Sequence, residues 1–84
     1  MNRQHVLFHL QEAEEELART IEEMRDNPQY DIGEYWVAMQ HLYHHLNTAW
    51  NGRDATLEQS QHVTDELFEQ WSRYPDPEDL PPLG

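Results

Sequence analysis

Apolar residues recur at steps of three and four along the first third of the chain, which predicts an amphipathic helix over residues 2–26. The apolar stripe consists of Val6, Leu10, Ala13, Leu17, Ile21 and Met24. The pattern stops at Asn27-Pro28, because the residue before a proline avoids helical backbone angles. We therefore expect a first helix that ends just before this pair.

The strongest periodicity follows over residues 32–51 and predicts a second helix. Its apolar positions are Ile32, Tyr35, Trp36, Met39, Leu42, Tyr43, Leu46, Ala49 and Trp50. Asp31 is a suitable N-cap, with Glu34 three residues later completing a capping box. Asn51-Gly52 tolerates the left-handed backbone conformation that ends many helices, so we expect the second helix to stop there.

A third helix is expected over residues 57–73, although its first half has few apolar positions. Thr56 and Gln59 form a second capping-box pair. Short linkers make consecutive helices antiparallel neighbours, so the pattern predicts an all-α, up-down-up three-helix bundle in one domain over residues 1–74. Four prolines in residues 75–84 predict an extended tail that is packed on the bundle or flexible.

The first predicted helix is too long for the second to cover, which leaves an apolar surface at its start. Together with outward-pointing Val37 and the tail leucines, this surface comprises Val6, Leu7, Phe8, Val37, Leu80 and Leu83. Two coverings are open: a second copy of the chain packed against the first helix, or the tail folded back. Of the two, we favour the homodimer.

Charge restricts the choice of partners. The 84 residues include 17 acids and five arginines without lysine, so the formal net charge is −12. Such a chain repels phosphate backbones and anionic lipid surfaces, which disfavours nucleic-acid and membrane partners. Acidic mimicry of nucleic acid toward a basic protein is a weaker alternative. The absence of cysteine and of a signal-like N-terminal segment predicts a cytoplasmic protein.

Histidine is the first candidate for chemistry. His5 with His9 and His41 with His45 are i, i+4 pairs, the spacing by which one helix can offer two imidazoles to a metal. His9 and His45 lie at the edges of the apolar stripes, whereas His41 projects to solvent. His9 and His45 are therefore the candidate ligands of an alternative function, a metal-binding bundle.

The carboxylates are the second candidate. Glu12-x-x-Glu15 and Glu66-x-x-Glu69 resemble, in spacing, the acidic motifs of helical nucleotide pyrophosphohydrolases, and the resemblance implies a divalent cation between helices. However, Glu12 and Glu15 project more than about 110° from the apolar stripe at 100° per residue. No basic cluster or glycine-rich loop is present to hold phosphate. We expect no cofactor and no catalysis, and predict a non-catalytic protein-interaction or homodimerisation module.

Overall fold

The computed structural model describes residues 1–75, and within that range the chain is all-helical, with four helices and no strand. The helices are α1 (Arg3–Asp26), α2 (Ile32–Asn51), α3 (Leu57–Gln61) and α4 (Asp65–Trp71). The predicted extended tail, with Leu80 and Leu83, lies outside the described residues.

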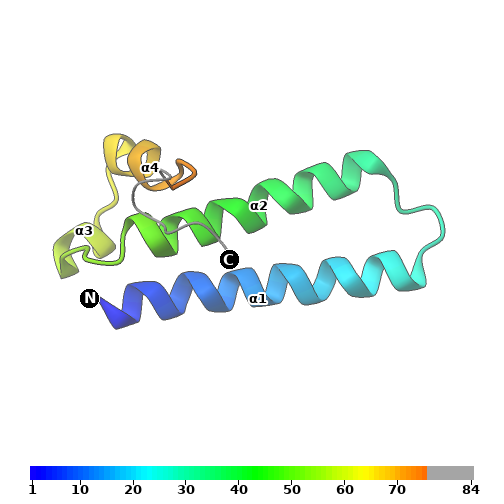
Figure 1. Cartoon of the computed structure of the whole chain (residues 1–84), viewed down its shortest axis with the longest axis horizontal. Helices are drawn as coiled ribbons and strands as arrows, with labels where there is room; N and C mark the ends of the chain where they lie inside the picture. The colour runs from blue at the N-terminus through cyan, green and yellow to red at the C-terminus, as the bar shows by residue number, and fades with distance from the viewer. Residues whose placement is uncertain (76–84) are drawn as a thin grey trace, which may run out of the picture.

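The first two helices form a long antiparallel hairpin, with the turn at one end and the start of α1 at the other (Figure 1). Both predicted helices are confirmed, and the bounds of α2 agree with the sequence pattern. Asp31 is the N-cap of α2, as predicted, and its carboxylate accepts a hydrogen bond of 2.9 Å from the Glu34 backbone N–H.

The prediction of one continuous helix over residues 57–73 is wrong, because the chain breaks at residues 62–64 and starts a new helix. Thr56 makes the predicted capping box with Gln59, and both of its hydrogen bonds are present. A second N-cap then follows at Thr64, whose side chain accepts from the Leu67 backbone N–H at 3.1 Å. The extended backbone at Thr64 separates α3 from α4.

The short helices occupy only one end of the hairpin. α4 packs against the C-terminal part of α2, and neither α3 nor α4 reaches the turn end (Figure 1). The predicted bundle of three full-length helices is therefore not confirmed, and much of the hairpin has no neighbouring helix within the described residues.

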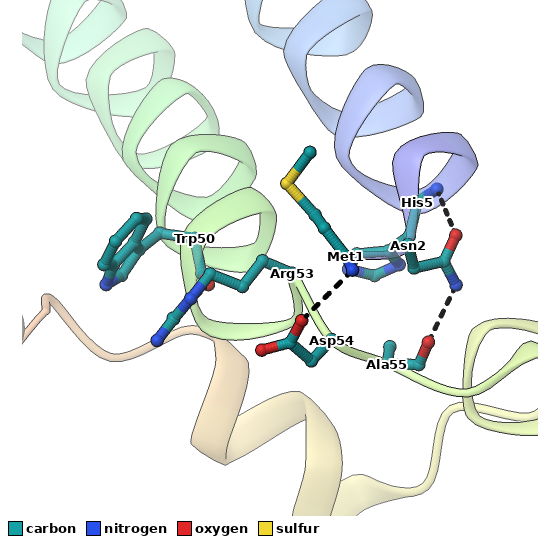
Figure 2. A network of polar contacts seen from close by, with 7 residues as sticks. All are labelled: Met1, Asn2, His5, Trp50, Arg53, Asp54 and Ala55. Atoms are coloured by element: carbon teal, nitrogen blue, oxygen red, sulfur yellow. Dashed lines mark hydrogen bonds and ion pairs between the residues drawn. The ribbon is translucent and has the colours of Figure 1, made fainter.

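The start of α1 is tied to the loop after α2, where the sequence led us to expect an uncovered end (Figure 2). The Asn2 side-chain amide donates to the Ala55 carbonyl at 2.8 Å and to Ser60 Oγ at 3.2 Å. The Met1 ammonium lies 3.6 Å from the Asp54 carboxylate. These contacts join the chain start to the segment that leads into α3.

The interface between α1 and α2 consists of small and polar side chains, and of the predicted apolar stripes only Ala13 and Ala49 are buried there. The buried apolar residues are Ala13, Ala38, Ala49 and Trp71, and the buried residues of α1 are His5, Ala13, Glu16 and Thr20. Among the described residues, no large side chain is fully buried. The stripe that the sequence identifies as core lies to one side of this interface, and most of it stays exposed.

Candidate functional site

The hairpin has two opposite faces of different chemistry. Leu46 and Thr48 are two positions apart on α2, and Leu10 and Phe8 are two apart on α1, so each pair projects about 200° apart at 100° per residue. Leu10 and Leu46 line one shallow hollow, together with Val6, Ala49 and Trp50. Thr48 lines another with His9 and Trp71. The apolar stripes of both helices therefore turn mainly to one face and the histidines to the other, while Trp36, Met39 and Tyr43 line a further hollow with His44 and Phe68.

We call the first surface the apolar face. Its members, at helical spacing along α1 and α2, are Val6, Leu10, Leu17, Ile21, Met24, Ile32, Tyr35, Leu46 and Trp50. The exposed fraction reaches 79% at Ile32 and is still 38% at Tyr35. A contiguous apolar surface of this extent marks an interaction site more often than a scattered set of exposed residues does.

Charge is nearly absent from the α2 half of the apolar face. α2 contains a single acidic residue, Glu34, and no arginine, and Glu34 projects away from the line of Leu46 and Trp50. Beyond the end of α2, the Arg53 guanidinium stacks over the Trp50 ring, 4.0 Å from its centroid. The acids that dominate the net charge therefore lie elsewhere on the molecule.

The opposite surface, the histidine face, is built on a cluster of four imidazoles from two helices: His5, His9, His44 and His45. His9 Nδ1 and His45 Nδ1 are 3.1 Å apart, so the structure brings the two sequence candidates into direct contact. His5 adjoins His9 with ring centroids 4.7 Å apart, and His44 adjoins His45 at 5.1 Å.

Two imidazoles of this cluster, His9 and His44, favour their neutral forms. Partial burial lowers the pKa of His9 to about 4, with further contributions from His5, His45 and His44 in that order. The pKa of His44 is also lowered, first by burial and then by His45 and His41. Because an imidazolium here would lose hydration and face other imidazoles, His9 and His44 are uncharged at neutral pH.

The contact between His9 and His45 is a hydrogen bond between two ring nitrogens. The ring centroids are 5.4 Å apart, about two ring radii more than the 3.1 Å between the nitrogens, so the rings meet head-on. One Nδ1 carries the hydrogen and the other accepts it. Within residues 1–75, no group of three or more His, Asp or Glu side chains is placed to hold a metal ion.

The carboxylate candidates are not gathered into one site. Glu15, Glu66 and Glu69 are exposed, and Glu12 is only partly covered. The buried carboxylate is instead Glu16, which pairs with Arg19 and lies 3.8 Å from His41 Nδ1. Glu16 lies one helical turn after Glu12, on the side of α1 that faces α2. The sequence pattern does not identify that side, so it does not predict the burial of Glu16.

The predicted interaction residues are dispersed. Of those described, only Val6 belongs to the apolar face. Phe8 lies on the histidine face, with its ring 5.1 Å from that of His9. Leu7 projects away from α2, and Val37 projects to the side opposite Leu46. Sequence reasoning missed Leu17, Ile21 and Leu46 as surface residues because their periodicity is also that of a core.

Within the described chain, no helix is both long and apolar enough to cross a membrane. Neither a family model, nor a curated protein, nor a solved structure matches this sequence.

Proposed function

We propose that this chain is a non-catalytic homodimerisation module in which two hairpins pack their apolar faces together as a four-helix assembly. The observation that carries the proposal is the apolar face itself: two amphipathic helices lie side by side with their apolar stripes turned mainly the same way, and no helix within residues 1–75 covers them. A helical stripe of this kind is stable when a second layer of structure covers it.

The area of the apolar face suits a dimer. Seven of its side chains expose between 38% and 79% of their surface: Leu10, Leu17, Ile21, Met24, Ile32, Tyr35 and Leu46. With about 200 Å² for a fully exposed side chain of this size, they present about 700 Å² per chain. A stable protein interface buries about 800 Å² per partner. Pairing the two faces would therefore produce an interface of ordinary size.

The charge distribution also permits self-association, although each chain has a formal charge of −12. On α1 most acids project away from the stripe of Leu17 and Ile21, and α2 contributes only Glu34. Two apposed faces would therefore keep most carboxylates at the outer rim, where water and salt screen their repulsion.

The alternative to a second copy on the apolar face is the C-terminal tail of the same chain. Pro75 lies beside Leu46 and Trp50 at the edge of that face. The large apolar side chains of residues 76–84 are Leu80 and Leu83. The face runs along α1 from Val6 to Met24, a rise of about 27 Å at 1.5 Å per residue. Two leucines supply too little surface to cover that length, so we favour the second copy.

Multi-angle light scattering at several protein concentrations tests the proposal. We expect a dimeric mass for the wild type, and a monomeric mass for Leu17→Glu and for Leu46→Glu, because each places a carboxylate at the centre of the interface. Phe8→Glu is the matched control: Phe8 is as exposed as these leucines, but lies on the histidine face.

Two results would overturn the homodimer. The first is a monomeric wild type at 100 μM or so, a concentration at which interfaces of this size associate. The second is a dimer that survives Leu17→Glu and Leu46→Glu but is lost in Phe8→Glu. Circular dichroism at 222 nm distinguishes a folded monomer from an unfolded variant in either case.

A further inference from the structure

The docking of α4 depends on the histidine face. The buried Trp71 ring packs on His5, with centroids 4.9 Å apart, and Phe68 packs on His44 at 5.0 Å. The residue after α4, Ser72, places its Oγ 3.2 Å from His44 Nδ1. The imidazoles of His9 and His45 lie in the next layer. α4 is therefore held on the hairpin by contacts with imidazole side chains.

Of the hydrogen bonds in this cluster, the one between His9 and His45 depends on the protons bound, because a protonated His5 would still donate to the Thr48 carbonyl oxygen. His5 Nε2 lies 3.3 Å from the Thr48 carbonyl oxygen, so this nitrogen carries a hydrogen and donates it. Between His9 and His45, one hydrogen satisfies both nitrogens. If both Nδ1 atoms carried hydrogen, two donors would face each other across 3.1 Å, and the rings would have to separate.

Both helices of the hairpin, α3 and α4 contribute groups around the cluster, and α3 places the uncharged Ser60 Oγ 3.5 Å from His5 Nδ1. The titratable groups on the hairpin near the cluster are His5, Glu12, Glu16, His41, His44 and His45. Glu16 is already paired with Arg19. From α4, the packed side chains are the uncharged Phe68 and Trp71, whereas Asp65, Glu66 and Glu69 are exposed. None of these carboxylates contacts His9 or His45. A positive charge on either ring would therefore be partly buried and would face other imidazoles, with no carboxylate in contact to compensate it.

Attraction between an imidazolium and an aromatic ring acts in the opposite direction, since His5 and His44 pack on Trp71 and Phe68. Burial and the neighbouring imidazoles lower the pKa of His9 and His44, so these two rings take up a proton less readily while α4 is docked. A hairpin without α4 exposes the imidazoles to water. It therefore binds more protons than the closed form, and the closed form loses stability as the pH falls below the ordinary histidine range.

We propose that the histidine face is an acid-sensitive latch, which holds α4 on the hairpin at neutral pH and releases it in mild acid. α4 lies opposite the apolar face, so the latch does not require the proposed homodimer, and either can fail without the other.

Amide hydrogen exchange measured by NMR between pH 7.5 and pH 5.0 tests the latch, with rates corrected for the intrinsic pH dependence of exchange. We expect the protection of α4 amides to fall about tenfold, a value reduced from the full effect of the shifted His9 pKa because the ring is half-buried. Amides of Leu17 to Thr20, far from the cluster, should keep their protection.

Replacing His9 by asparagine should remove most of this pH dependence, because asparagine forms hydrogen bonds but does not titrate here. His45→Asn serves the same purpose if the first variant unfolds. His62→Asn is the matched control, since His62 is an exposed histidine outside the cluster. The latch is refuted if α4 protection is constant down to pH 5.0, or if both variants keep the full wild-type pH dependence.

Discussion

Gly52, directly after α2, provides the sharpest test of the packing. Its backbone φ is −99°, which any residue adopts, so no left-handed conformation requires glycine here. A Cβ at this position would overlap the His5 Nε2 atom and approach the Thr48 carbonyl oxygen to 3.0 Å and Trp71 Cε2 to 3.1 Å. Gly52→Ala therefore forces apart the end of α2, the start of α1 and α4.

The expected cost follows from what has to move. The His5 ring cannot give way without losing its hydrogen bond to Thr48, worth about 1 kcal/mol. Overpacking against Trp71 adds about 1–3 kcal/mol. We expect the free energy of unfolding to fall by about 2–4 kcal/mol, a large share of the roughly 5 kcal/mol typical of so small a domain.

Urea denaturation followed by circular dichroism at 222 nm, at one protein concentration and pH 7.5, measures this loss. With a slope of about 1 kcal/mol/M for a small domain, the midpoint should fall by about 2 M or more. Gly33→Ala is the matched control, because its Cβ meets only Asp31 Oδ1, at 3.3 Å. It lies inside α2, where alanine is favoured over glycine by about 1 kcal/mol. Equal midpoints for Gly52→Ala and the wild type would refute the packing described here.

Two further substitutions probe the ends of helices. Asn2→Ala removes both the N-cap of α1 and the hydrogen bonds to Ala55 and Ser60, and should lower the free energy of unfolding in urea by about 2 kcal/mol; a loss below about 0.5 kcal/mol would contradict that role. Thr64→Ala removes the N-cap of α4 at a cost of about 1 kcal/mol, and should reduce exchange protection in α4 more than in α1. Uniform loss in both helices would mean that α4 has no separate stability.

The local elements were predictable because their signals are local. Asp31 and Thr56 each accept the hydrogen bond that their spacing indicated. The break at Thr64 was also present in the sequence, as a threonine followed by Asp65 and Glu66, a good N-cap with acids in the first turn. This signal competes with the apolar spacing from Leu57 to Trp71, which is also compatible with one continuous helix.

The arrangement of the helices could not be predicted in the same way. Hydrophobic periodicity shows which side of a helix avoids water, but not whether the same chain supplies the cover. The structure turns the stripe of Leu17 and Leu46 outward, and packs the helices through small residues such as Ala13 and Ala38. The contact between His9 and His45 depends on that rotation, so periodicity alone placed both residues only at the stripe edges.

The Asn2 network also has a kinetic consequence. The hairpin turn joins positions close in sequence, whereas the bond from Asn2 to Ser60 joins residues 58 positions apart. Because the entropy cost of closing a loop rises with its length, the turn at Pro28 forms first. Each residue pair that then forms between α1 and α2 shortens the loop that the next pair has to close. We therefore expect the contacts between α1 and α2 to form first near Pro28 and then successively toward the start of α1. The hydrogen bonds of Asn2 would then form last during folding. They would also be the first contacts to break during unfolding.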